Sequence, residues 1–437
     1  MAWGNRGNAD EDFRKLCGQI AESRTSSDSL TVLRSRYGSI WDKSRCAVQL
    51  AKALGTNTNL KELYCLGLDF TLEGCEALSD ALVNNKTLKK LSIGHDGFGD
   101  DQLKALLRNG TLGRVEIIDL ERRCLSGASG ESLGKALGLP GSCLVSVNLA
   151  FNKLGDDGLR ALAAGLSSAT KLKTLDLKEN GFSSAGIAAL AESLIQSDVK
   201  LNRLDLSWNE AMGSAGVAAL ANVAVDDLIL DGCNGGDEGC LTLAEGKSRR
   251  VLSLAENDLT SQGALAIAER VFLHAKEDHH AVSLRFARNT RIGDAGVEAL
   301  GSVLDRRRRL FPQATAVRAL DLSQVGATRL PPSLVTGAVT SLSFIGNGPL
   351  EHLELIDALS VESTTIESLA LSGTGITNMS AVFRALHTHA SLNTIEFGGI
   401  PLDEVAREEL RILREINPRL DIAVDKGVQD EDRGQSF

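Results

Sequence analysis

The feature that most constrains this chain is a block of residues that returns at an almost fixed spacing. The block reads LVSVNLAFNKLGDDGLRAL from Leu144, and comparable blocks begin at Leu172 and Leu201, after steps of 28 and 29 residues. A constant period of this length predicts an array of one stacked supersecondary unit. Block starts recognised in both directions give about fourteen units, at Leu30, Leu60, Leu88, Val115, Leu144, Leu172, Leu201, Val225, Arg249, Ala281, Val317, Val339, Ile366 and Leu392.

Each block predicts a strand, a turn and a helix. Leucines at the first, fourth and sixth positions indicate a short half-buried strand, because alternate side chains point to the same face. The ninth position is usually asparagine, whose amide can both donate to and accept from the backbone of a turn. A glycine then precedes leucines at helical spacing, and residues such as Asp156 and Ser184 are expected to satisfy free amides where the helix starts. The asparagines are Asn152, Asn180, Asn209, Asn257, Asn289 and Asn347.

The period, the LxxLxLxxN strand and the GxxAL helix resemble the ribonuclease-inhibitor type of leucine-rich repeat. That subfamily includes the repeat regions of NOD-like receptors, Ran GTPase-activating proteins and tropomodulins. The resemblance covers Leu30 to Asp421 and implies an α/β leucine-rich repeat solenoid, a horseshoe with a parallel sheet on its concave face and helices on its convex face. It also implies that a protein partner binds on the inner face or its rim.

The chain divides into three predicted segments. Residues 1–29 form an N-terminal cap, or alternatively a short docking helix, because Phe13, Cys17 and Ile20 give this segment one apolar face. Residues 30–424 form the solenoid. Residues 425–437 form a polar tail, DKGVQDEDRGQSF, whose composition predicts disorder.

Composition predicts a cytoplasmic protein without cofactor or metal. No apolar run approaches the roughly 20 residues needed to span a bilayer, and the start, MAWGNRGNADEDF, carries acids where a signal peptide needs basic and apolar stretches. The eight cysteines lack any CxxC pair, and neither close histidine pair has the i, i+4 spacing of metal ligands. A net charge of -10 argues against nucleic acid as a partner. We expect a monomer.

No motif for a nucleophile, a metalloprotease or a phosphate-binding loop is present, so we predict that the chain is not an enzyme. The favoured function is a non-catalytic protein–protein interaction scaffold. One alternative is a GTPase-activating protein of the Ran type with a small GTPase as partner, because that family shares this architecture, although the chain lacks its long acidic tail. A second alternative is an effector-like or innate-immune recognition module.

Inward-facing strand positions supply the first candidate site. The third, fifth and seventh positions of the middle blocks are rich in carboxylates, and equivalent positions on neighbouring strands lie about 4.8 Å apart. The resulting column would favour a partner with a basic surface. A purely structural interpretation stands beside it, because LDL is also the consensus strand of this repeat. The candidate residues are Asp119, Glu121, Asp176, Lys178, Arg203, Asp205, Asp227 and Asp231.

Trp208 and a cluster of arginines complete the candidate partner-binding set. Trp208 occupies the eighth position, where the strand ends, and an exposed tryptophan can bury a large area while donating through its indole. Packing against the neighbouring turn is the alternative. Further along, Arg285 and Arg288 reverse the sign of the charge. Acidic and basic segments on one face would fix the orientation of a partner with the opposite pattern.

Overall fold

A computed structural model describes residues 9–33, 43–66, 68–94, 98–110, 114–273, 282–311, 317–360 and 365–424. Contacts divide the chain into two compact units, the first comprising Met1–Met212 with Asn222–Leu228 and the second Gly213–Ala221 with Ile229–Phe437. The predicted tail, residues 425–437, lies outside the described residues. The division into cap, solenoid and tail therefore stays a prediction.

The first unit alternates strands with helices. Its strands are β1 Ser29–Leu33, β2 Glu62–Leu66, β3 Lys90–Ser92, β4 Ile117–Asp119, β5 Ser146–Asn148, β6 Thr174–Asp176, β7 Leu201–Asp205 and most of β8 Val225–Ile229. Its described helices are α1 Ala9–Ala21, α3 Lys43–Thr56, α4 Leu72–Asn84, α5 Asp100–Leu107, α6 Gly127–Leu137, α7 Gly155–Leu166, α8 Ser184–Gln196 and the short 3-10 helix η2 Glu210–Met212.

The second unit repeats the same alternation. Its strands are β9 Val251–Ser253, β10 Ser283–Arg285, β11 Val317–Asp321, β12 Val339–Ser343, β13 Ser368–Ala370, β14 Thr394–Glu396 and β15 Asp421–Ala423. Its described helices are α9 Gly213–Ala219, α10 Gly236–Glu245, α11 Ser261–Leu273, α12 Gly293–Leu310, α13 Pro332–Thr336, α14 His352–Leu359, α15 Met379–Ala385, the 3-10 helix η3 Leu386–Thr388 and α16 Glu404–Ile416.

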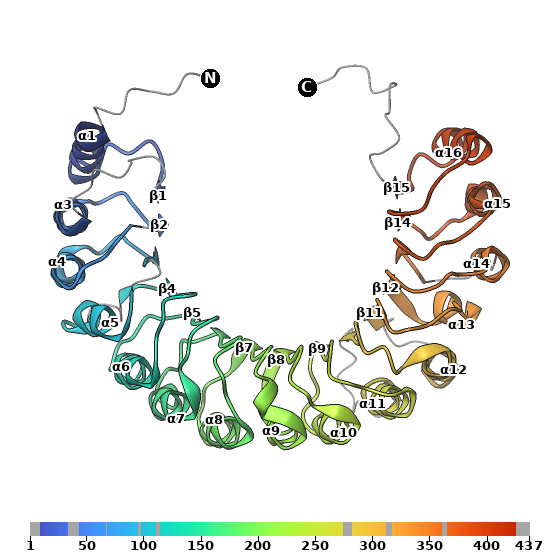
Figure 1. Cartoon of the computed structure of the whole chain (residues 1–437), viewed down its shortest axis with the longest axis horizontal. Helices are drawn as coiled ribbons and strands as arrows, with labels where there is room; N and C mark the ends of the chain where they lie inside the picture. Colours follow the sequence, from blue (N-terminus) through green and yellow to red (C-terminus); the bar gives the residue numbers. More distant parts are fainter. Residues whose placement is uncertain are drawn as a thin grey trace. The chain divides into compact units, whose positions relative to one another are not determined.

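Strands in each unit follow chain order and line the inner side of a curve, while helices cover the outer side (Figure 1). Neighbouring strands pair in parallel, so that Asn148, Asp176 and Asp205 lie opposite one another on β5, β6 and β7. The leucines of each block are buried between sheet and helices; Leu175 and Leu204 are both 0% exposed. The predicted leucine-rich repeat solenoid is confirmed, and each predicted block start lies within a strand or two residues before one.

The first described helix, α1, covers the beginning of the first unit. Phe13 and Ile20 are 0% exposed. The amide of Asn57, just after α3, donates to the Ile20 carbonyl oxygen at 2.6 Å, and the Thr56 hydroxyl donates to that of Ala21 at 3.1 Å. The apolar face predicted for this segment is therefore packed inside the protein.

Buried asparagines join consecutive repeats. In the first unit, the Asn209 amide nitrogen donates to the carbonyl oxygens of Leu206 at 2.7 Å and Leu177 at 3.2 Å. Its amide oxygen accepts from the backbone nitrogens of Asn180 at 2.9 Å and Phe182 at 3.2 Å. One side chain thus satisfies four backbone groups of two repeats where the turn has left the sheet. Equivalent bonds surround Asn152, Asn180, Asn257, Asn289 and Asn347.

A second link between repeats is an aspartate at the start of a helix. The Asp156 carboxylate accepts from the backbone nitrogen of Ser183 at 2.8 Å and from its hydroxyl at 2.5 Å. The sequence predicted that Asp156 satisfies free amides of its own helix. The structure shows instead that its carboxylate bonds to Ser183 of the next repeat. The repeat glycine makes room for this contact, because a Cβ on Gly186 would lie 2.3 Å from the Asp156 Oδ1 atom. Matching pairs join Asp100 to Ser126, Asp237 to Thr260 and Asp294 to Thr328.

These links alter the acidity of the carboxyl groups. Partial burial by itself would raise the pKa of Asp156, but the hydrogen bonds from Ser183 and the charge of Arg160 outweigh burial and hold that pKa below its ordinary value of 3.8. A carboxyl group whose pKa is lower in the folded state stabilises the fold above its unfolded pKa. Its contribution disappears as the pH falls through the folded value.

Removing one buried asparagine should destabilise the first unit. We expect Asn209→Ala to lower the free energy of unfolding by about 3 kcal/mol, because buried backbone groups left without partners cost about 1–3 kcal/mol each and such losses are not fully additive. Urea denaturation followed by circular dichroism measures the change. Asn202→Ala alters an exposed asparagine, and should change stability by no more than about 0.5 kcal/mol. Equal midpoints for the two variants would contradict the structural role of Asn209.

Replacing the linking aspartate should have a pH-dependent effect. We expect Asp156→Asn to destabilise the protein at neutral pH, and we expect the difference from the wild type to shrink as the pH falls below about 4, where the wild-type carboxylate also becomes protonated. Urea midpoints measured across this pH range test the expectation. Asp157→Asn is the matched control, because Asp157 makes only a surface ion pair with Arg160. A difference that stays constant with pH would rule out linkage through this carboxylate.

Candidate protein-binding face of the first unit

The eighth position of the blocks has a left-handed backbone. The φ angles are 56° at Arg122, 57° at Phe151, 50° at Glu179 and 62° at Trp208. Glycine, which adopts this conformation freely, occupies the same position at Gly232, Gly346, Gly373 and Gly399. Other residues lose about 1–2 kcal/mol there. Two large aromatic side chains therefore occupy positions that the backbone itself would assign to glycine.

Cationic side chains alternate with these two rings. The Arg122 guanidinium lies 4.3 Å from the centroid of the Phe151 ring. The Lys178 ammonium lies 5.1 Å from the same centroid and 5.9 Å from that of the Trp208 ring. All three separations are within the range of cation–π attraction. We call the series Arg122, Phe151, Lys178 and Trp208 the rim ladder.

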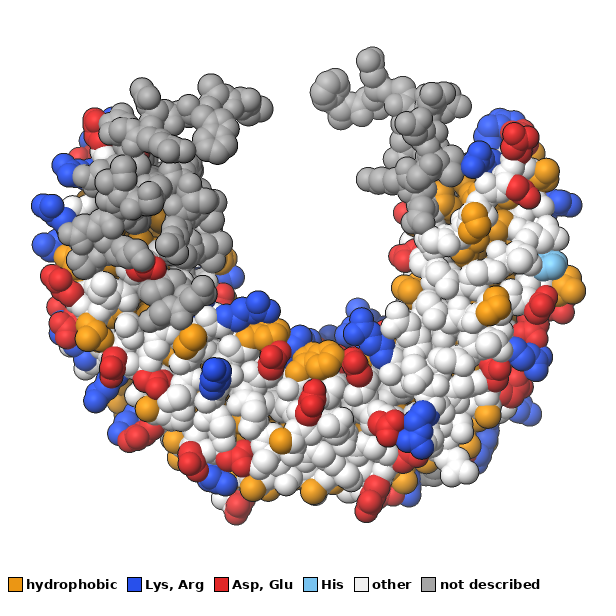
Figure 2. Space-filling model, in the orientation of Figure 1, with side chains coloured by type: hydrophobic (Ala, Val, Ile, Leu, Met, Phe, Trp, Pro, Cys, Tyr) orange, Lys and Arg blue, Asp and Glu red, His pale blue; other side chains and the backbone are white. Residues whose placement is uncertain are grey.

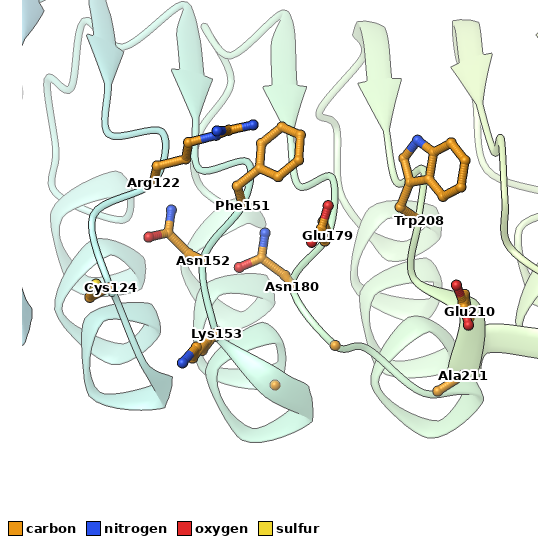
Figure 3. A pocket seen from close by; sticks show the side chains of 12 residues that line it. Arg122, Cys124, Phe151, Asn152, Lys153, Glu179, Asn180, Trp208, Glu210 and Ala211 are labelled. Atoms are coloured by element: carbon orange, nitrogen blue, oxygen red, sulfur yellow. The ribbon is translucent and has the colours of Figure 1, made fainter. Parts of the chain in front are cut away.

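An open groove of about 860 Å³ runs below the rim ladder. Figure 3 shows Phe151 and Trp208 projecting from turns on the same side, with Glu179 on the turn between them and the Arg122 guanidinium directed at the Phe151 ring. The buried amides of Asn152 and Asn180 form part of its lining. Side chains of hydrophobic and charged kinds gather along this inner edge, over β5 to β7 (Figure 2). The groove thus combines partly exposed aromatic area with charges fixed on rigid turns.

Acidic residues at the fifth position have a local structural role. The Asp119 carboxylate accepts from the backbone nitrogen of Glu121 at 3.2 Å, that of Asp176 from Lys178 at 3.1 Å, and that of Asp205 from Ser207 at 3.1 Å. The carboxylate therefore satisfies an amide two residues further on, where the chain leaves the strand. This contact gives a physical reason for the LDL consensus.

Asp176 differs from Asp119 and Asp205 in how many hydrogen bonds its carboxylate already accepts. Asp119 also accepts from Ser92 at 2.9 Å and from Asn148 at 3.1 Å, and Asp205 also accepts from the guanidinium of Arg203 at 2.9 Å. Among the described residues, only the backbone nitrogen of Lys178 donates to the Asp176 carboxylate. One Asp176 oxygen is therefore left for an external donor.

The surroundings of Asp176 favour a cation from outside. Burial raises the pKa of Asp176 above its ordinary value of 3.8, and the nearby charges of Asp205 and Glu121 raise it further, against the opposing effects of the Lys178 backbone and Arg203. A carboxylate whose charged form is disfavoured in this way gains from an added positive group. Asp205, in contrast, is only 7% exposed and already paired. It offers little to a partner.

The remaining candidates, Asp227, Asp231, Arg285 and Arg288, lie outside strands β4 to β7 and the rim ladder. Asp227 lies half-buried on β8. In the second unit, Asp231 accepts from the Ser253 hydroxyl at 2.6 Å, Arg285 is exposed on β10, and Arg288 pairs with Glu256 at 3.5 Å. The expectation that acidic and basic segments jointly orient a partner stays a prediction.

Two members of the rim ladder, Arg122 and Phe151, were not among the candidates found in the sequence. Both occupy the eighth position, the position that singled out Trp208. That column has glycine in four of the described blocks and Glu256, Arg288 and Gln324 in three others, so Phe151 and Trp208 stand out among these blocks as the two aromatic residues. The approach of Arg122 and Lys178 to the Phe151 ring from neighbouring repeats could not be read from one block.

Neither a metal centre nor a membrane span is found in the described part of the chain. No group of three or more histidine, cysteine, aspartate or glutamate side chains is arranged there to hold a metal ion. None of the helices described there combines the length and the apolar character that crossing a bilayer would require.

Comparison with known proteins places the repeats in a class. The family model described as "Leucine Rich repeat" matches residues 142–163, 168–191, 198–221, 250–268 and 282–301. These matches show leucine-rich repeats, and the relatives below make the chain similar to proteins of the ribonuclease-inhibitor type.

Curated relatives with similar sequence include two ribonuclease inhibitors. The chain is 29% identical to ribonuclease inhibitor from Mus musculus over 266 residues, which are 58% of this chain and 58% of the relative. It is 30% identical to ribonuclease inhibitor from Sus scrofa over 221 residues, 49% of this chain and 46% of the relative. "NACHT, LRR and PYD domains-containing protein 12" from Homo sapiens is 31% identical over 227 residues, 49% of this chain and 21% of that protein. The chain thus spans about half the length of the inhibitors it matches.

The left-handed backbone at position eight leads to a prediction about stability. We expect Glu179→Gly to be more stable than Glu179→Ala by about 1 kcal/mol, because glycine relieves the positive φ angle while both variants remove the same exposed carboxylate. Urea denaturation of the two variants gives the difference directly. An alanine variant as stable as the glycine variant would show that this turn is not strained, and would weaken the inference drawn from Phe151 and Trp208.

Proposed function

We propose that this protein is a non-catalytic protein-binding scaffold whose first unit binds a partner through the strand face β4–β7 and the rim ladder beside it. The observation that carries the proposal is the presence of Phe151 and Trp208 at left-handed positions. Neither ring is fully buried, so packing in the core does not offset the strain of the left-handed backbone. Strained residues with exposed aromatic area are typical of binding sites.

The acidic strand face supports a partner with a basic group. Asp176 keeps an oxygen for an external donor, and its charge would be stabilised by a lysine or arginine of the partner. The rim ladder would supply apolar contact area next to this acid. Central aromatic anchors surrounded by charges that select the partner are a common arrangement in protein interfaces.

We place this function in the cytoplasm. None of the eight cysteines forms a disulfide in the structure, and Cys65, Cys233 and Cys240 are 0% exposed, where they fill space as small apolar side chains. Burial raises the pKa of the Cys75 thiol to about 12, which keeps it protonated and unreactive. Cysteines of this kind suit a reducing compartment.

The proposal predicts which side chains a partner needs. Affinity purification should compare the intact chain with the double variant Phe151→Ala, Trp208→Ala and with the single variant Asp176→Asn, each checked for folding by circular dichroism. Affinity for direct partners should fall about thirtyfold for each ring removed, since aromatic anchors each contribute about 2 kcal/mol. Asp176→Asn should weaken binding to a smaller extent and reduce its dependence on salt. Asp205 is not substituted, because its buried carboxylate accepts hydrogen bonds from Arg203 and Ser207 and its replacement would disturb the fold.

A matched control separates the binding face from general surface effects. Glu192→Ala removes an exposed side chain of α8, on the opposite side of the repeat, and should leave recovery unchanged. Equal recovery by the double variant, the control and the intact chain would place the binding site elsewhere. If a small GTPase depends on this face and hydrolyses GTP faster in the presence of the protein, the GTPase-activator alternative replaces the scaffold.

A further inference from the structure

The Lys178 ammonium is held in an unusual environment. The Lys178 backbone nitrogen is fixed by its bond to Asp176 at 3.1 Å, and the side chain then reaches outward until the ammonium lies near both aromatic rings. Among the described residues, no oxygen accepts a hydrogen bond from this ammonium. Three charged N–H donors therefore face the rim without a protein acceptor.

Arg122 presents a second cation to the same ring. Its guanidinium lies against Phe151, and its Nε atom is 3.4 Å from a Glu121 oxygen, an exposed contact of little strength. The fixed planar group has five N–H donors, so others remain for an anion. Both cations of the rim ladder thus lie against an aromatic ring, and each keeps N–H donors from which no carboxylate of the described residues accepts.

We propose that the rim ladder recognises a carboxylate carried next to an apolar side chain on the partner protein. This inference rests on the proposed function and names the partner's chemistry at the rim. The carboxylate accepts from Lys178, and the positive charge of Arg122 against the same Phe151 ring adds to the attraction. Because the Lys178 ammonium already lies near both rings, the neighbouring apolar side chain packs on the exposed area of Phe151 and Trp208 rather than between them.

Charge decides between a protein carboxylate and a nucleic-acid phosphate. Glu121 and Asp176 lie directly beside the rim ladder on the strand face, and the whole chain has a net charge of -10. A polyanion would meet repulsion from these neighbouring carboxylates, whereas a single carboxylate can contact the cation alone. The partner segment at the rim is therefore acidic and apolar, while the group that meets Asp176 is basic.

Trp208 fluorescence offers a direct test with defined probes. The chain has three tryptophans, and Trp3→Phe with Trp41→Phe leaves Trp208 as the single reporter in the full-length protein. The probes are the acetylated pentapeptide amide alanine–leucine–glutamate–phenylalanine–alanine and the same peptide with glutamine replacing glutamate. We expect the glutamate peptide to bind about fivefold more tightly, since a partly exposed charged hydrogen bond contributes about 1 kcal/mol.

Matched lysine variants identify the group responsible. Lys178→Met keeps an unbranched apolar side chain and should make the two peptides bind equally, and Lys178→Arg should preserve the preference. Lys153→Met is the control, because Lys153 lines the groove outside the rim ladder, and it should leave the fivefold ratio intact. Circular dichroism confirms that each variant is folded.

Three results would overturn carboxylate recognition. They are equal affinities for the two peptides in the wild-type background, a preference that survives Lys178→Met, and the absence of a saturable change with either peptide. An oligothymidylate that binds more tightly than the glutamate peptide, and loses binding in Lys178→Met, would assign the site to nucleic acid instead. Loss of partner recovery in the Phe151→Ala, Trp208→Ala variant without any peptide preference would leave the scaffold function standing.

Discussion

The structure depends above all on the buried asparagine amides that join one repeat to the next. A turn between strand and helix cannot use sheet hydrogen bonds, yet its backbone groups are buried and need partners. Asn209 bonds to four of these groups, one in its own repeat and three in the preceding repeat. Because both repeats contribute, neither turn can relax without breaking bonds to its neighbour. Stability and geometry are therefore set together at the interfaces where a repeat carries this asparagine.

This constraint extends outward to the rim. The residue before each asparagine is held in the left-handed region, and the Phe151 backbone nitrogen still donates to the Lys178 carbonyl oxygen of the neighbouring repeat at 2.8 Å. Its side chain is consequently directed away from the core by a rigid backbone. A side chain at this position packs poorly in the core but is held ready to contact a partner, because little further ordering is needed when the partner binds. Phe151 and Trp208 make use of this position.

Scaffold and recognition are separated within a single strand. Leu175 and Leu177 face the core, and the Asp176 carboxylate between them satisfies the Lys178 amide with one oxygen. The carboxylates of Asp119 and Asp205 also accept hydrogen bonds from neighbouring side chains. An acidic strand pattern alone therefore overstates the charge available to a partner. Hydrogen bonding decides which of several equivalent aspartates can act outside the fold.

The sequence by itself determined the repeat architecture, because the leucine period and the asparagine column are local patterns that each block states completely. It also singled out Trp208 and Asp176 as candidates. It did not distinguish Asp176 from Asp205, because it showed that Arg203 and Ser207 flank Asp205 but not that both side chains bond to its carboxylate. It did not find the rim ladder, because Arg122, Phe151 and Lys178 belong to three different blocks. Only tertiary structure decided these contacts, as stacking brings together side chains about 28 residues apart in the sequence.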